Sequence, residues 1–193
     1  MALPAEELRY TFADYLSWDE DDHVELIDGK RFPMEMPFTI HQRIRGDLGV
    51  QLCNYLRDTP CEIFIGPLPV RLFEKETDSP SNVSTVLIPD IWMVCDPGKL
   101  DDYGCKGAPD LIIEILSPSS RRHDRIVKLD LYQKAGVREY WVVNPEDRTV
   151  QVMLLKDSYL LPVEDYGRED MAKVNVLEDC AIDLSKVFLE QTG

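Results

Sequence analysis

Two carboxylate side chains stand inside stretches of sequence that otherwise read as buried β-strands. Glu114 lies in DLIIEIL (residues 110–116), and Asp90 lies in VLIPDIWMV (residues 86–94). An ionised group in such a place is costly unless a metal, a cation or hydrogen bonds compensate it. Either each acid ends a strand or pairs with an arginine, or the two together form the oxygen-rich pair that Mg²⁺ or Mn²⁺ needs.

A lysine on the following helix adds a positive charge to this region. The pattern predicts a helix over about residues 120–135, ended by Gly136. At 3.6 residues per turn, Lys128 shares a stripe with Asp124 and Leu131, within a largely apolar face. Such a lysine is either an ion-pair partner, with Asp124 one turn earlier as a candidate, or a charge aimed at a metal-bound anion. The spacing leaves both interpretations open.

The start of the same helix is rich in arginine. Arg121, Arg122 and Arg125 follow one another in SSRRHDR. They form a local positive patch beside the predicted acids. The patch is either a solvated helix start or a set of phosphate contacts.

The composition limits the classes of function. The chain has 193 residues, with 21 Lys and Arg against 36 Asp and Glu, and a net charge of −15. This balance argues against a broadly basic surface that grips nucleic acid, and leaves room only for a local basic site. The five cysteines are odd in number and form no C-x-x-C pair, so we expect reduced thiols. No apolar run reaches the length of a membrane span, so we expect a cytoplasmic protein.

The elements that must position these residues indicate a mixed α/β fold. HVELIDGKRFPMEMP (residues 23–37) predicts a β-hairpin around Asp28-Gly29. A helix follows from His41, and strands are expected at residues 61–66, 68–73, 86–94, 110–116 and, as a pair, within 139–155. No linker divides the chain, so we predict one domain over residues 1–193 with its core at about 24–155.

Several of these stretches together resemble a known family. VELIDG, HQRI, PDIWMVCDP and GAPDLIIEILSPSSRRHDRIVKLDLYQKAGVREYWVVNP are similar to the Uma2 family of restriction-endonuclease-like proteins, within the PD-(D/E)xK nuclease superfamily. The resemblance covers about Glu25 to Leu155. It implies a restriction-endonuclease-like fold, with a central mixed β-sheet flanked by helices and an N-terminal β-hairpin.

The resemblance also implies which residues carry the chemistry. Asp90, preceded by Pro89, matches the aspartate of the PD half-motif, and Glu114 matches the acid of the second half-motif. The position that holds lysine in the motif is Leu116 in this sequence. Members of the superfamily can supply that lysine from a neighbouring helix, which makes Lys128 the candidate.

By the same resemblance, the protein is expected to be a metal-dependent endonuclease acting on DNA. Asp90 and Glu114 would bind Mg²⁺ or Mn²⁺, and Lys128 would position or activate the attacking water. Glu25, His41 and Asp124 are possible accessory residues. Glu25 is otherwise read as a hairpin ion-pair residue and His41 as a packing histidine at the helix start.

Two further expectations concern assembly and the competing function. By analogy with endonucleases that cut both strands, we expect a homodimer. The alternative function is a catalytically inactive binding or scaffold protein on the nuclease fold, which the net charge and Leu116 in the lysine position favour.

Overall fold

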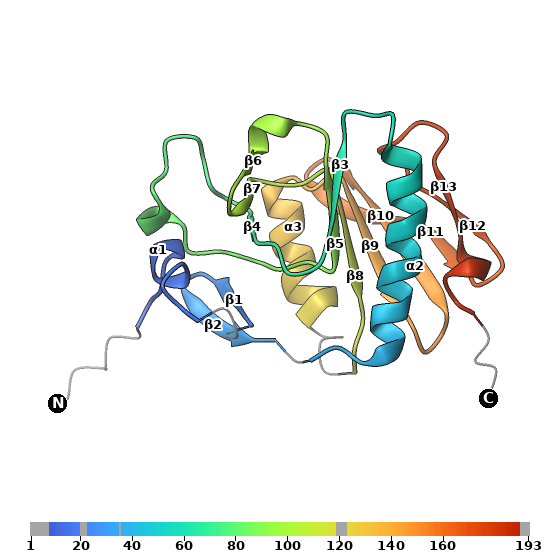
Figure 1. The fold of residues 1–193 in the computed structure, drawn as a ribbon, viewed down its shortest axis with the longest axis horizontal. Coiled ribbons are helices and arrows are strands. Elements are labelled where there is room, and N and C mark those ends of the chain that lie inside the picture. The colour runs from blue at the N-terminus through green and yellow to red at the C-terminus, as the bar shows by residue number, and fades with distance from the viewer. Residues whose placement is uncertain (1–7, 20–22, 35, 119–122, 190–193) are drawn as a thin grey trace.

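A six-stranded mixed sheet, in the order β11-β10-β9-β8-β5-β3, forms the centre of the molecule (Figure 1). The computed structural model describes residues 8–19, 23–34, 36–118 and 123–189. The sheet strands are β3 (Glu62–Ile65), β5 (Ile91–Val94), β8 (Leu111–Ile115), β9 (Glu139–Asn144), β10 (Thr149–Lys156) and β11 (Tyr159–Gly167). Only β8 and β9 are parallel within this sheet. The predicted mixed α/β class is confirmed.

Smaller elements surround the central sheet. The helices are α1 (Phe12–Tyr15), α2 (Thr39–Leu56) and α3 (Leu129–Ala135), with the π-helix η3 (His123–Lys128) directly before α3. Short 3₁₀ turns are η1 (Pro80–Asn82), η2 (Pro97–Lys99) and η4 (Leu184–Lys186). The remaining strands are β1 (Val24–Ile27), β2 (Lys30–Pro33), β4 (Val70–Arg71), β6 (Leu100–Asp101), β7 (Gly104–Lys106), β12 (Met171–Lys173) and β13 (Ala181–Asp183).

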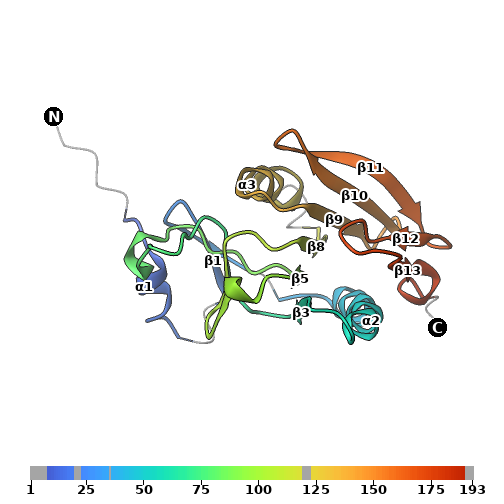
Figure 2. The same ribbon diagram turned by 90° about the horizontal axis from the view of Figure 1, so that it is seen from above.

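The two faces of the sheet are covered by different helices (Figure 2). Helix α2 packs Ile44, Leu48 and Leu52 onto one face, together with the C-terminal segment that contains β12 and β13. Helix α3 packs Leu131 and Tyr132 onto the other face. Because alternate residues of a strand point to opposite faces, the central strands read as continuous apolar runs, as in a sheet covered on both sides.

The N-terminal hairpin forms as the sequence predicts. Asp28 (φ 50°) and Gly29 (φ 77°) both adopt positive φ between β1 and β2, the geometry of a type I′ turn. An antiparallel bridge between Leu26 and Val86 ties β1 to the segment that leads into β5. The hairpin is thereby held beside the sheet, with Glu25 on the strand next to that segment.

The connection from β8 to β9 runs through a helix that is not α-helical throughout. The sequence predicts an α-helix over about residues 120–135, but residues 123–128 form the π-helix η3 and α3 begins at Leu129. Single-turn π segments within helices are often found at functional sites. The helix ends at Gly136 with φ 90°, as expected for a glycine after the last turn.

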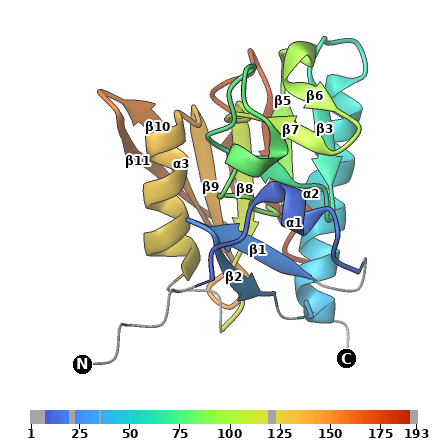
Figure 3. The ribbon, with the colours of Figure 1, turned by 90° about the vertical axis from the view of Figure 1, so that its left-hand side faces the viewer.

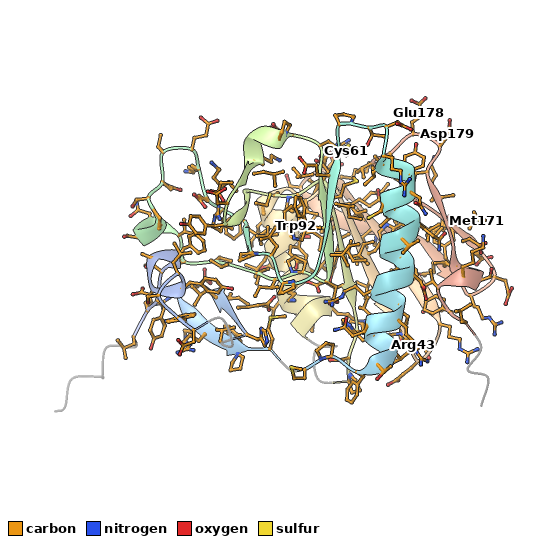
Figure 4. All side chains as sticks on the ribbon, in the orientation of Figure 1. Arg43, Cys61, Trp92, Met171, Glu178 and Asp179 are labelled. Carbon is orange, nitrogen blue, oxygen red and sulfur yellow. A yellow bond between two sulfur atoms is a disulfide. The ribbon has the colours of Figure 1, made fainter. Side chains whose placement is uncertain are left out.

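One expectation about the cysteines is wrong. Cys61 and Cys95 form a disulfide, with their Cα atoms 3.9 Å apart. Glu62 pairs with Val94 across β3 and β5, so these cysteines are the next opposed residues beyond the ladder. Figure 4 labels Cys61 beside β3, at the opposite end of α2 from Arg43. The two cysteines lie 34 residues apart in sequence, so no short cysteine motif marks them as a pair.

Within the part of the chain that the structure describes, no helix combines the length and the apolar character needed to cross a membrane.

Candidate functional site

Lys128 lies between two carboxylates that come from different parts of the chain. Its Nζ atom is 2.9 Å from Oε1 of Glu114 and 3.0 Å from Oε1 of Glu25. All three residues are buried, with 3–4% of their surface exposed. Burial of ionised groups is tolerated only where partners offset the loss of hydration. The contacts with Lys128 therefore explain how the buried carboxylate of Glu114 is accommodated in an apolar strand.

Tyr132 holds the Glu114 carboxylate from the same helical face as Lys128. Its hydroxyl donates to Oε1 of Glu114 at 2.5 Å. Full burial, and after it the negative charge of Glu114, raise the pKa of Tyr132 well above its usual value. The phenol therefore keeps its proton and acts as a donor, which fixes the direction of the hydrogen bond.

Glu25 and Asp90 also accept backbone hydrogen bonds. The backbone N–H of Ile88 donates to Oε1 of Glu25 at 2.9 Å, and that of Ile115 donates to Oδ2 of Asp90 at 2.8 Å. Asp90 directly precedes β5, so it marks a strand start, whereas Glu114 lies within β8. The antiparallel pairing of β5 with β8 places Ile91 opposite Ile113, which brings both acids to the same end of the sheet.

His41 pairs with Asp90 from the first turn of α2. Its Nε2 atom is 3.1 Å from Oδ2 of Asp90, and both side chains are largely buried. Nδ1 of His41 is buried and has no hydrogen-bond partner among the described residues. This arrangement fits the tautomer that carries its proton on Nε2 and donates it to Asp90. The packing interpretation of His41 is thus incomplete, because the ring also contacts a site carboxylate.

These residues line one cavity of about 690 Å³. Glu25, His41, Asp90, Glu114 and Lys128 all contribute to its lining. The cavity is bordered by the β1–β2 hairpin and the first turns of α2, which Figure 3 shows at the same end of the molecule. Four of the sequence-predicted site residues and accessories therefore meet Lys128 in a single cavity.

The donor set fits a hard divalent cation with few protein ligands. Asp90 and Glu114 line the same cavity, and Mg²⁺ is commonly held by one or two carboxylates while it retains several waters. Among the residues that the structure describes, no group of three or more His, Cys, Asp or Glu side chains is arranged to hold a metal. The described residues therefore offer two carboxylates at one cavity, a donor set that suits a largely hydrated ion and not an all-protein cage.

The other predicted residues lie elsewhere or outside the described part of the chain. Arg125 is exposed and does not line the cavity. Arg121 and Arg122 lie outside the described residues, as does the side chain of Asp124. Asp110, which follows Pro109 in a second Pro-Asp pair, accepts hydrogen bonds from Nη1 of Arg138 at 3.0 Å and from the backbone of Cys95 at 2.8 Å, and it does not line the cavity.

Some residues of the site were not identified from the sequence. Tyr132, which contacts Glu114 but does not line the cavity, lies four residues after Lys128 and could have been found from the shared helical face. The cavity lining also includes His23, Gln42 and Arg45, together with the apolar residues Phe32, Pro33, Met34, Met36, Pro37 and Phe38. They come from loops and helix surfaces whose sequence pattern gives no signal of a site.

The comparisons with known proteins agree with this architecture. The model of the Uma2 family, described as "Putative restriction endonuclease", matches residues 12–185. An uncharacterized protein of Synechocystis sp., slr1290, is 30% identical over 122 residues, which are 62% of this chain and 60% of that protein. The chain thus matches less than two thirds of that relative's length.

A solved structure shares the fold. It is the crystal structure of a "putative nuclease belonging to DUF820" from Anabaena variabilis, with a TM-score of 0.70, 19% sequence identity, and coverage of 92% of this chain and 97% of that chain. At this identity the match concerns the fold alone. It confirms the predicted arrangement of a central mixed sheet flanked by helices.

Proposed function

The chain belongs to the Uma2 family, and we propose that it is a metal-dependent endonuclease that hydrolyses phosphodiester bonds of DNA. The observation that carries the proposal is the position of Lys128, whose Nζ lies 2.9 Å from Glu114 in the cavity that Asp90 also lines. Two acids and a cation, the set that a PD-(D/E)xK site would need, thus line one cavity, although Leu116 stands in the motif's lysine position.

Asp90 and Glu114 would hold Mg²⁺ or Mn²⁺. When bound, such an ion supplies Lewis acidity toward the phosphate and lowers the pKa of a bound water. The chain's own groups would act around it. Tyr132 orients Glu114 through its 2.5 Å hydrogen bond, and His41 orients Asp90 from 3.1 Å. Lys128 holds a positive charge at the cavity, where it can face the scissile phosphate or the attacking water.

The competing function is an inactive binding protein on the same fold. It is favoured by the ion pairs of Lys128 with both Glu25 and Glu114, because an ammonium held by two carboxylates is already neutralised. The two proposals differ in whether a divalent cation changes the chemistry of the cavity.

The test combines metal binding and cleavage on the same samples. Wild type, Glu114→Ala and Asp90→Ala are titrated with Mn²⁺ by calorimetry and then incubated with supercoiled plasmid. Asp110→Asn is the matched control, because Asp110 is a buried carboxylate that pairs with Arg138 and lies outside the cavity lining.

Each outcome separates the two functions. Mn²⁺ binding and nicking in wild type and Asp110→Asn, with both lost in the two cavity variants, would support the nuclease. Binding without cleavage of plasmid or of single-stranded DNA would favour the inactive protein. Equal Mn²⁺ affinity in wild type and both cavity variants would show that Asp90 and Glu114 are not the metal ligands.

We also propose that the protein acts as a homodimer. Strand β11 lies at the edge of the six-stranded sheet, and Tyr159, Leu161 and Val163 on it are 47–61% exposed. An exposed edge with apolar side chains can pair with another chain. Sedimentation equilibrium at micromolar concentration should give twice the monomer mass, and a monomer at all concentrations would refute the proposal.

A further inference from the structure

One wall of the cavity is made of large apolar side chains. Phe32, Met34, Met36 and Phe38 line it and are 36%, 37%, 78% and 60% exposed. They belong to the segment that leads from β2 into the first turn of α2. Exposed apolar side chains gathered at a concave site indicate a binding surface more often than scattered ones do.

The backbone of this wall is restricted. Pro33 directly follows Phe32 and Pro37 directly precedes Phe38, and both prolines line the same cavity. Proline fixes φ near −65° and so reduces the number of conformations available to the chain. The wall therefore presents its side chains at a reduced entropic cost of ordering on binding.

The charges of the cavity do not favour a polyanion by themselves. Its described lining carries the acids Glu25, Asp90 and Glu114 against the cations Arg45 and Lys128, which sum to −1 with histidines neutral. The whole chain carries −15. A DNA strand bound here must gain affinity from contacts other than a basic surface, which a grip on duplex phosphates would require.

The shape of the cavity points to a small part of a strand. About 690 Å³ is within the range of small-molecule pockets, about 300–1,000 Å³. The floor residues Glu25, Glu114 and Lys128 are only 3–4% exposed, so a phosphate must descend into the cavity to reach them. An unpaired nucleotide can do this, whereas the paired strands of a duplex hold each phosphate at the outside of a wide helix.

We propose that the wall formed by Phe32, Met34, Met36 and Phe38 binds an unpaired base of a DNA strand, whose neighbouring phosphate reaches the cavity floor. Bases stack on aromatic side chains with little regard for sequence, and methionine provides an adaptable, polarizable surface. The choice of ligand rests on the proposed nuclease function. The protein would then act on single-stranded or flapped DNA in preference to intact duplex.

The test measures binding separately from cleavage. Fluorescence anisotropy with Ca²⁺ present compares a labelled 12-nucleotide DNA strand, the same strand in a duplex, and the RNA strand of the same sequence. The variant is Phe38→Ala, whose exposed side chain can be removed with little effect on folding. The matched control is Phe73→Ala, an exposed phenylalanine that lies outside the cavity lining. Thermal unfolding and sedimentation are recorded for each.

The expected result is tighter binding of the DNA strand than of the duplex. This binding should be weakened about tenfold in Phe38→Ala, as is typical for loss of one stacked base, and unchanged in Phe73→Ala. Four results would overturn it: tighter binding of the duplex, preference for the RNA strand, equal affinity of Phe38→Ala and wild type, or loss of self-association in Phe38→Ala without loss of DNA affinity. The last would assign the wall to a second copy of the chain.

Failure of the inference can be told from failure of the proposed function. Metal-dependent plasmid nicking that needs Glu114 but is unaltered in Phe38→Ala would overturn the inference and leave the nuclease intact. Strand binding that depends on Phe38, with no cleavage of any DNA in Mg²⁺ or Mn²⁺, would support the binding site and overturn the nuclease.

Discussion

Replacing Lys128 with methionine removes the cation from between two buried carboxylates. Methionine keeps an unbranched chain of similar length, so the main change is the loss of the charge. Glu25 and Glu114 then lie buried without the ammonium that contacts both of them. We expect a large loss of stability, together with loss of any metal-dependent cleavage.

The magnitude follows from the geometry. At an effective dielectric constant of 20, unit charges separated by 2.9 Å and 3.0 Å attract by about 6 kcal/mol per pair. Desolvation opposes this by several kcal/mol for each ion, so the triad as a whole contributes little net stability. Removing one partner is different, because the desolvation of the remaining charges is no longer offset, and we expect a cost of about 3–5 kcal/mol.

The assay is urea unfolding followed by circular dichroism. The matched control is Lys134→Met in the same helix, where Nζ lies 2.6 Å from Asp130 but the two side chains are 61% and 47% exposed. An exposed pair of this kind should contribute about 0.5 kcal/mol or less. Adding Glu114→Gln to Lys128→Met should recover part of the lost stability, because one uncompensated charge is removed.

Two results would show that Lys128 does not compensate the buried acids, and that solvent or another group does so. One is a Lys128→Met variant whose free energy of unfolding falls no more than that of Lys134→Met. The other is a double variant with Glu114→Gln that is destabilised by the full sum of the two single changes.

Two further predictions concern alkaline pH and the disulfide. Because the pKa of Tyr132 is raised well above 10 in the folded state, its stabilising contribution is present below pH 10 and is lost as pH rises toward the folded value. Between pH 10 and 11 wild type should therefore lose about 1 kcal/mol more stability than Tyr132→Phe; parallel urea curves of the two proteins would contradict this. Reduction of the Cys61–Cys95 disulfide, which spans 34 residues, should lower the free energy of unfolding by about 4 kcal/mol, and peptide mapping without reductant that finds both thiols free would contradict the pairing.

The sequence was sufficient for the fold class and for the central acids because both leave local signals. Apolar runs of strand length predicted β5 and β8, and Asp28-Gly29 predicted the hairpin that the structure confirms. An acid within an apolar strand is conspicuous for the cost of its burial. Lys128 was conspicuous for the same reason on its helical face, and its burial at 4% exposure confirms that it points inward.

Contacts between distant segments could not be predicted in this way. Glu25 contacts Lys128 over more than a hundred residues, because the β1–β2 hairpin is held against the sheet by the bridge of Leu26 to Val86. The Cys61–Cys95 bond depends on which strands are neighbours and on their register. Neither strand order nor register can be read from a single stretch of sequence.

Leu116 shows how a lysine can reach the strand's carboxylate although the position that holds lysine in the motif is apolar. It is 3% exposed and packs in the core covered by α3, so a lysine there would have to replace a buried apolar side chain. Glu114 lies two residues earlier on the same strand face, and that face is the one that η3 and α3 cover. A lysine on the covering helix therefore reaches the Glu114 carboxylate at 2.9 Å, without a second charged residue in the strand. The electrostatics of the cavity depend on where the ammonium lies in space and not on which element of the chain supplies it.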